Sequence, residues 1–160
     1  MITRFDLDWH IKDLIMWEGF EPYPYLDTEG VWTIGFGSTR WDGVEVDEDT
    51  TMVTVQAATV RLKGDAYTGI VDAAKWAGDA WNVLSGPRQA VLANMHYQMG
   101  AKRMRGFINT KNLVRTGRCR DAAVEMLRGS EHGTKSAWFI QTERRAQTMS
   151  TRFAESNYHV

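Results

Sequence analysis

The first residues of the chain have the apolar spacing of one amphipathic helix. Four apolar residues fall on one face at the helical period, namely Leu7, Ile11, Leu14 and Ile15. This pattern predicts a helix over about residues 8–17. Gly19 ends it, and the prolines at 22 and 24 prevent it from continuing because proline lacks the N–H that a helix interior needs.

After these prolines the pattern changes to short alternating segments. The segments 23–26 and 31–36 flank the turn Asp27–Gly30, which has aspartate first and glycine fourth, as a type I turn prefers. We therefore predict a β-hairpin at this point. Val44 and Val46 indicate a third short strand.

Helical spacing then returns and persists to the end of the chain. The predicted helices cover about residues 54–75, 85–100, 101–105, 109–116, 120–128 and 142–153, and the stretch 129–135 is typical of an exposed loop. The sequence thus predicts an α+β fold in one domain, residues 1–160. A β-containing lobe spans about 20–53, a helical lobe takes 1–19 and 54–160, and substrate is expected in a cleft between them.

Charge divides the chain into two halves. Residues 1–65 hold 5 Lys/Arg against 13 Asp/Glu, net −8, whereas residues 66–160 hold 14 against 7, net +7, so that the overall charge of −1 hides the split. The split indicates either an anionic partner for the basic half or two lobes that attract each other. A nucleic-acid partner is disfavoured, because no aromatic residue is interleaved with the basic cluster Lys102–Arg105 and the acidic half repels phosphate.

Composition and spacing exclude several other classes of site. Cys119 is the only cysteine, so no internal disulfide can form, and no histidine is near it in the sequence. The four histidines lack metal-ligand spacing, and we expect neither a metal nor a cofactor. No secretory signal and no apolar run of about 18 residues can be found. We therefore expect a chain made in the cytoplasm, without stable membrane insertion.

Three side chains between the first helix and the hairpin carry candidate chemistry. Glu18 follows Trp17, and apolar neighbours favour the protonated form of a carboxyl group. Asp27 begins a turn, where water and backbone N–H groups favour the carboxylate. Thr33 adds a hydroxyl that can hold a water molecule. Two carboxyl groups in contrasting surroundings are what glycoside hydrolysis requires. Taken singly, Glu18 is more typical of a surface acid, Asp27 of a turn former and Thr33 of a strand former, so the hypothesis depends on their joint spacing.

That spacing resembles the catalytic triad of the phage-type lysozymes, the muramidase endolysins of tailed phages. Eight residues separate Glu18 from Asp27, and five separate Asp27 from Thr33. The resemblance extends in order over about residues 14–153. Its further blocks are Glu18–Gly19, Tyr25, Asp27–Gly30, Thr33–Gly37, Asn94–Gly100 with Gly106 and Phe107, and Trp138 with Gln141, Thr142, Arg145 and Ala146.

The resemblance implies a lysozyme-like fold and cleavage of the β-1,4 bond between N-acetylmuramic acid and N-acetylglucosamine in peptidoglycan. Glu18 would be the general acid, while Asp27 and Thr33 would position the attacking water and give inversion, which calls for carboxyl groups about 6.5–9.5 Å apart. By position, the substrate-binding residues would be Gly37, Thr39, Tyr97, Gln98, Thr110 and Glu125.

Two features depart from the resemblance. Ser38 stands where well-known members have histidine, and residues 129–135 look inserted while the stretch between Phe36 and Thr54 looks short. These departures concern the width of the cleft and the substrate subsites rather than the triad.

The expected biology follows from the same resemblance. The partner is bacterial peptidoglycan, and the chain is expected to be a monomer. It would reach the wall in the periplasm through a membrane lesion of the kind a holin makes, and its action would lyse the host cell. Two alternatives remain open, a lytic transglycosylase that acts on the same bond without water and a non-catalytic wall-binding module. The presence of both Asp27 and Thr33 favours the hydrolase, since a transglycosylase needs no water-holding pair.

Overall fold

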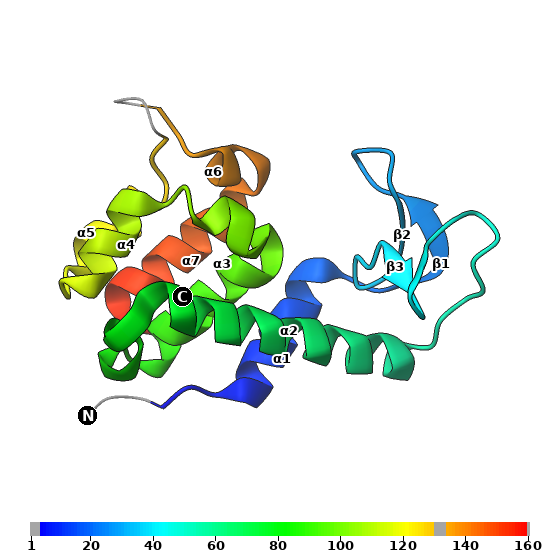
Figure 1. The fold of residues 1–160 in the computed structure, drawn as a ribbon, viewed down its shortest axis with the longest axis horizontal. Coiled ribbons are helices and arrows are strands. Elements are labelled where there is room, and N and C mark those ends of the chain that lie inside the picture. Colours follow the sequence, from blue (N-terminus) through cyan, green and yellow to red (C-terminus); the bar gives the residue numbers. More distant parts are fainter. Residues whose placement is uncertain (1–3, 130–133, 160) are drawn as a thin grey trace. The chain divides into compact units, whose positions relative to one another are not determined.

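A computed structural model describes residues 4–129 and 134–159 of the chain (Figure 1). Its residues divide into two compact units. The hairpin unit is Asp8–Asp65, and the helical unit is Met1–Leu7 with Ala66–Val160. Helices and a small antiparallel hairpin coexist, so the expected α+β fold is confirmed. The lobe boundaries expected from the sequence stay a prediction.

Helix α1, Leu7–Glu18, opens the hairpin unit. Its first residue, Leu7, belongs to the helical unit, and the hairpin unit starts at Asp8. Gly19 ends α1 at φ 68°, a left-handed conformation that favours glycine. Of the predicted apolar face, Ile11 and Leu14 are buried, but Leu7 is 41% exposed. The helix therefore buries a narrower face than the spacing indicates.

Strands β1, Glu21–Leu26, and β2, Trp32–Gly35, form the predicted antiparallel hairpin. Tyr25 lies opposite Thr33 in the register, and an irregularity interrupts the pairing between Glu21 and Tyr25. The two prolines of β1 account for this irregularity, because neither can donate to the ladder.

The predicted third strand through Val44 and Val46 is wrong in detail. Instead, β3, Arg40–Trp41, and β4, Val44–Glu45, pair as a second small hairpin. Val46 lies just outside β4, where its N–H donates to the Thr39 carbonyl at 3.0 Å. Asp42 and Gly43 both have positive φ, which allows the tight turn that a run of valines does not reveal.

A ring contact and a backbone hydrogen bond connect these elements. The rings of Phe20 and Phe36 meet at a tilt of 50° with centroids 5.3 Å apart, and the Val53 N–H donates to the Pro22 carbonyl at 2.9 Å. Gly35 at φ 69° approaches Ala58 so closely that a Cβ at this position would lie 3.2 Å from the alanine methyl. Small residues at this crossing hold the hairpin against the start of the following helix.

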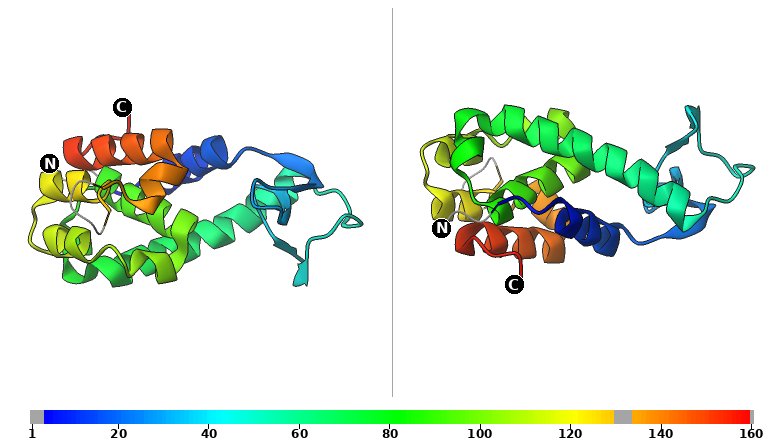
Figure 2. Two further views of the ribbon diagram at one scale, coloured as in Figure 1. Left: turned by 90° about the horizontal axis from the view of Figure 1, so that it is seen from above. Right: turned by 90° about the horizontal axis from the view of Figure 1, so that it is seen from below.

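The helical unit is organised around α3, Gly86–Met104, whose residues 90–96 are all buried. Helix α2, Val55–Ala77, runs from one unit into the other, and the 3-10 helix η1, Gly78–Val83, follows it. The remaining helices are α4 (Ile108–Arg115), α5 (Cys119–Glu125), α6 (Ala137–Gln141) and α7 (Glu143–Glu155). Helix α7 packs on α3, α5 and α6, and its place beside α3 can be followed in Figures 1 and 2.

Several predicted helix ends differ from the structure. Gly100 leaves helical geometry, with φ 68° and ψ 163°, and helical residues follow it up to Met104, which confirms the predicted break between the helices 85–100 and 101–105. Neither η1 nor α6 is predicted from the sequence, because each is too short to show a period. The predicted loop 129–135 lies largely outside the described residues. At its ends Arg128 and Lys135 pair in a β-bridge.

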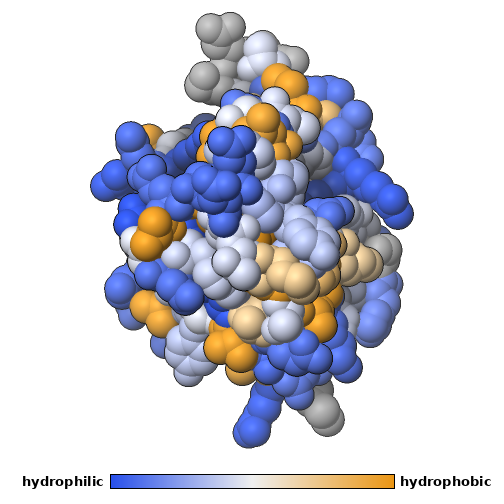
Figure 3. Space-filling model, turned by 90° about the vertical axis from the view of Figure 1, so that its right-hand side faces the viewer, coloured by the Kyte–Doolittle hydropathy of each residue, from blue (hydrophilic) through white to orange (hydrophobic). Residues whose placement is uncertain are grey.

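Among the described residues, no helix is both long and apolar enough to cross a membrane. Apolar side chains are nevertheless exposed in both units, Val44 at 68% and Val83 at 70% among them. On the face drawn in Figure 3, such side chains lie among hydrophilic ones.

Candidate functional site

Glu18 is the last residue of α1 and is half-buried. The backbone of Gly37 approaches its carboxyl group, since a Cβ at Gly37 would lie 3.8 Å from Glu18 Oε2. Gly37 also has φ 82°, which a side chain would strain. The loop after β2 therefore runs close to the Glu18 carboxyl group, and the lack of a side chain at Gly37 leaves the space beside that group unfilled.

Asp27 closes the hairpin turn with one of its two carboxylate oxygens. Oδ1 accepts hydrogen bonds from the N–H groups of Glu29, at 2.9 Å, and Val31, at 2.8 Å. The Asp27 backbone also pairs with Val31 and with Gly30, which has φ 75°. Among the described residues nothing hydrogen-bonds Oδ2. The turn thus fixes the carboxylate through one oxygen and leaves the other for a ligand or a water molecule.

Thr33 is only 3% exposed and lies in the middle of β2. Its hydroxyl donates to the Val31 carbonyl at 3.0 Å, within the same turn region that holds Asp27. Because that bond uses the hydroxyl proton, the lone pairs of Oγ1 remain as acceptors. Thr33 can therefore accept a hydrogen bond from a water molecule but cannot donate one without breaking its bond to Val31.

Tyr25 is an additional member of this group that sequence reasoning gave no role. Burial raises the pKa of its phenol, and the negative charges of Glu21, Asp27 and Glu18 raise it further. Tyr25 thus lies in the field of both candidate catalytic carboxyl groups and stays neutral. Its place opposite Thr33 is given by the hairpin register of the structure, which the sequence analysis did not predict.

Two residues beyond Gly37 complete the sequence-predicted set in the hairpin unit. Ser38 exchanges both backbone hydrogen bonds with Ile34, each 2.9 Å long, which turns the loop tightly back on β2. Thr39 follows and is exposed, with its carbonyl engaged by Val46. The hairpin unit therefore contains Glu18, Asp27, Thr33, Gly37 and Thr39.

A pocket of about 470 Å³ opens in the helical unit. Two of the predicted substrate-binding residues, Thr110 and Glu125, line it, and Thr110 is 1% exposed. The complete lining is Met99, Arg103, Gly106, Phe107, Ile108, Asn109, Thr110, Glu125, Arg128, Gly129, Ser136, Ala137, Trp138 and Gln141. We call this the helical-unit pocket.

The other two predicted residues of the helical unit, Tyr97 and Gln98, do not line the pocket. Gln98 accepts a hydrogen bond from the indole N–H of Trp138 at 2.7 Å and so fixes a side chain of the pocket wall. Tyr97 is half-buried, and its backbone lies where α3 meets α2, since a Cβ at Gly69 would lie 3.2 Å from Tyr97 N. The structure thus gives Gln98 a supporting position and Tyr97 a place at a helix crossing.

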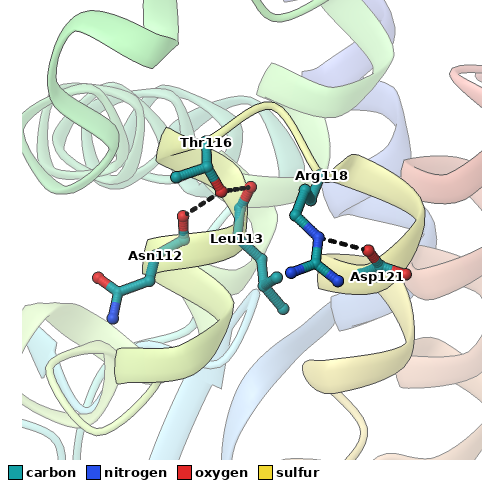
Figure 4. Close-up of polar contacts among 5 residues, drawn as sticks. All are labelled: Asn112, Leu113, Thr116, Arg118 and Asp121. Atoms are coloured by element: carbon teal, nitrogen blue, oxygen red, sulfur yellow. Dashed lines mark hydrogen bonds and ion pairs between the residues drawn. The ribbon is translucent and has the colours of Figure 1, made fainter.

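Polar contacts gather at the turn between α4 and α5, outside the lining of the helical-unit pocket (Figure 4). The Thr116 hydroxyl donates to the Asn112 carbonyl at 2.8 Å and lies 3.3 Å from that of Leu113. Arg118 pairs with Asp121 at 2.7 Å across the first turn of α5. The threonine bonds thus lie at the end of α4, and the ion pair lies at the start of α5.

Pocket residues outside the predicted substrate-binding set include Arg103, Phe107, Arg128 and Trp138, of which Phe107 and Trp138 lie in blocks of the family resemblance. Phe107 and Trp138 meet edge to face with centroids 6.4 Å apart. The basic cluster Lys102–Arg105 was visible in the sequence, but nothing local indicates that Arg103 alone of its cations faces a pocket. No group of three or more histidine, cysteine or acidic side chains able to hold a metal occurs within the described ranges.

Comparison with known protein families gives a match over most of the chain. The family model described as Phage lysozyme matches residues 15–148, which include Glu18, Asp27, Thr33 and the whole helical-unit pocket. Members of that family are phage enzymes that break down the bacterial cell wall, with peptidoglycan as substrate. Since the match covers most of the 160 residues, the chain belongs to the phage lysozyme family.

Proposed function

We propose that this phage lysozyme hydrolyses the β-1,4 bond between N-acetylmuramic acid and N-acetylglucosamine with inversion at the anomeric carbon. The observation that carries the proposal is the contrast between its two carboxyl groups. Asp27 has one oxygen fixed by two backbone N–H groups and the other without a hydrogen bond among the described residues, while Glu18 ends a helix beside the bare backbone of Gly37.

The proposed reaction assigns one proton transfer to each carboxyl group. Glu18, in its acid form, donates its proton to the glycosidic oxygen as the bond to the anomeric carbon breaks. A water molecule held by Asp27 Oδ2 and the lone pairs of Thr33 attacks that carbon from the opposite face, its oxygen forms the new bond, and one of its two protons passes to Asp27. The products are a new reducing muramic end and a free hydroxyl on the leaving sugar, and proton exchange with solvent restores both carboxyl groups.

Tyr25 supports the charge pattern that this reaction needs. Since burial and three carboxyl groups raise its pKa, it stays a neutral phenol and adds no negative charge beside Asp27. An additional anion there would oppose the second ionised carboxylate. We expect the carboxyl groups to lie about 6.5–9.5 Å apart in the reactive complex, the separation that leaves room for a water molecule.

Digestion of purified peptidoglycan followed by mass spectrometry of the released ends tests the proposal. Reducing muramic ends are expected. Anhydro ends would assign the chain to the lytic transglycosylases, in which the sugar's own hydroxyl replaces water. Binding to the wall without release of glycan fragments would favour the remaining alternative, a non-catalytic wall-binding module. Proton NMR of the first product tests inversion, because the α-anomer must appear before mutarotation if the β-bond is inverted.

The same proposal includes the route of the enzyme. We propose that it acts as a monomer, is made in the cytoplasm of the host, reaches the wall in the periplasm through a holin-type lesion, and lyses the host. Expression in a bacterium with and without a co-expressed holin tests this route. Lysis is expected only with the holin, and equally fast lysis without it would contradict the requirement.

A further inference from the structure

Helix α2 carries small and apolar residues on two opposite faces. One face is buried, and its members are Ala58, Leu62, Ala66, Gly69, Ala73 and Ala77. The members of the opposite face are Ala57, Val60, Gly64, Tyr67, Val71 and Ala74. Of these, Ala74 is half-buried and the others are exposed. We call this second face the α2 seam.

The α2 seam repeats in alternating steps of three and four residues, which is the spacing of a coiled-coil contact. It extends over about 26 Å of helix. Val60 is 72% exposed, Tyr67 62% and Val71 41%. Because α2 is one continuous helix, these side chains share a face by helical geometry alone (Figure 1). Single exposed apolar side chains are ordinary on a protein surface, whereas a regular row of them is typical of a contact surface.

Gly64 interrupts this row without a reason inside the chain. A helix interior disfavours glycine more than any other residue except proline. Gly64 does not have a positive φ, and a Cβ at this position would meet no described atom within 4 Å. Gly69, on the buried face, is the opposite case, because a Cβ there would lie 3.1 Å from the Ala93 carbonyl oxygen. Gly64 thus leaves a gap in the seam that no described residue fills.

The α2 seam is complementary to itself when it is reversed. A two-fold axis at its middle places two copies of α2 antiparallel, so that each seam residue faces one of the second copy. The facing pairs are Ala57 with Ala74, Val60 with Val71, and Gly64 with Tyr67. Small residues therefore meet at the ends, valines meet between, and the largest side chain of the row meets its gap. Such a match of knobs to holes is what close packing of two helices requires.

Charges beside the seam fit the same antiparallel arrangement. Arg61 and Asp72 lie on one flank, and like flanks meet in an antiparallel pair. Arg61 of each copy then comes beside Asp72 of the other, with an offset of about 3 Å along the axis. Within the chain the two residues have exposed partners on α2 itself, since Arg61 pairs with Asp65 at 3.2 Å and Asp72 with Lys75 at 3.9 Å. The flank is therefore balanced in charge, and a second copy matches it.

We propose that two copies of this chain associate through the α2 seam as an antiparallel two-fold pair, with Tyr67 of each copy packed on Gly64 of the other. Such a pair uses the same surface on both copies and closes at two. One helix on each side makes a small contact, of the size class that associates weakly. The dimer is therefore the form of the concentrated free protein, and dilution returns the monomer of the proposed function. The inference goes beyond that function and does not depend on it.

Sedimentation velocity from about 1 µM to about 1 mM protein tests the pairing. Wild type should show a monomer–dimer equilibrium with a Kd on the order of 0.1 mM. Val60→Ser and Gly64→Leu should each weaken it at least about tenfold, because each change acts twice in a two-fold pair. Val55→Ser is the matched control, since Val55 is an exposed valine of α2 outside the seam, and its Kd should stay within about twofold of wild type. Gly64→Leu is expected to fold, because leucine favours a helix and the space beside position 64 is open.

A mixing experiment tests the direction of the two helices. Arg61→Glu and Asp72→Arg each place like charges opposite one another in their own dimers, so each alone should associate at least about fivefold more weakly than wild type. An equimolar mixture of the two should recover association, because the mixed pair contains opposite charges at both contacts. A parallel pair does not bring positions 61 and 72 together and predicts no such recovery.

Four results would overturn the inference. These are a protein that stays monomeric up to about 1 mM, a dimer that Gly64→Leu leaves intact or tightens, equal losses in Val60→Ser and Val55→Ser, and assembly that grows beyond two copies. Failure of the mixture to recover would contradict the antiparallel register. Since sedimentation does not involve peptidoglycan, each of these results leaves the proposed hydrolysis standing, and anhydro products in the digestion would leave the pairing standing.

Discussion

The two units of the molecule differ in charge and in how they hold their functional groups. The hairpin unit, Asp8–Asp65, has 4 Lys/Arg and 12 Asp/Glu, net −8, and the helical unit, with the rest of the chain, has 15 and 8, net +7. In the hairpin unit, turns and a helix end present the carboxyl groups, and Asp27 is fixed by backbone N–H groups. In the helical unit, helices packed on a buried core surround a pocket.

Because of this difference, we expect acid–base chemistry in the hairpin unit and substrate recognition in the helical unit. Short turns held by their own backbone can fix a carboxylate oxygen without burying it, which suits acid–base chemistry at a wet site. A pocket between packed helices keeps a defined shape, which suits recognition. We therefore expect changes in the hairpin unit to act mainly on kcat, and changes in the helical unit to act on stability or KM.

The largest effect is expected at Glu18. Glu18→Gln keeps the shape of the side chain but removes the proton donor, so kcat should fall by about 10²–10⁴-fold with the free energy of unfolding changed little. Turnover of labelled peptidoglycan and chemical denaturation measure the two quantities. Glu21→Gln, at the exposed start of β1, is the matched control and should keep most of the activity. Near-normal turnover by Glu18→Gln would remove Glu18 from its role.

A core variant of the helical unit should show the opposite pattern. Leu92 is 0% exposed in α3, and Leu92→Ala should lower the free energy of unfolding by about 2–5 kcal/mol. At a temperature where the variant is folded, kcat should stay within about twofold of wild type. If kcat falls as far as in Glu18→Gln while the variant is folded, the proposed division of labour is wrong.

Two substitutions of Asp27 distinguish its role in holding the turn from its role in the reaction. Asp27→Asn keeps an oxygen that can accept from Glu29 and Val31 but loses the charge, so kcat should fall about 10²-fold or more with little loss of stability. Asp27→Ala should in addition lose about 1–3 kcal/mol of stability. Asp47, whose Oδ1 also holds a turn, gives the control Asp47→Asn, which should keep full activity. Equal losses in the Asp27 and Asp47 variants would contradict a chemical role for Asp27.

The smallest effect is a pH dependence of stability in the helical unit. Burial lowers the pKa of His96, and this effect outweighs the opposing contributions of the Leu92 carbonyl and Asp72. The folded state therefore takes up the proton less readily than the unfolded state, whose histidine pKa is about 6.5. Stability should fall as pH drops below about 6.5 towards the lower folded value. Urea unfolding of wild type and His96→Gln across this window measures the slope, and identical slopes would contradict the assignment.

Local sequence signals were enough to predict most of the fold. The hairpin was predictable because its turn needs aspartate first and glycine fourth, and the long helices because their apolar stripes extend over several turns. Helix α6 was missed because only five residues are helical, although Ser136 caps it by accepting from Phe139 N–H. The β3–β4 hairpin was missed although the sequence contains its signal, since Asp42-Gly43 is a dipeptide typical of two-residue hairpin turns and both residues have positive φ.

The candidate site was predictable only in part. The spacing of Glu18, Asp27 and Thr33 identified the hairpin residues through the family resemblance. It did not indicate that the Thr33 hydroxyl donates to the Val31 carbonyl, or that only one oxygen of the Asp27 carboxylate accepts hydrogen bonds within the turn. The place of Arg103 depends on how the end of α3 packs against segments far along the chain, and no local pattern encodes it.

The central claim is that water, held beside Asp27, attacks the anomeric carbon. Digestion of peptidoglycan in water enriched in ¹⁸O, with immediate chemical reduction of the products, tests it most directly. The account predicts muramic ends that carry one ¹⁸O atom for each bond cut. Anhydro ends without the label would contradict it.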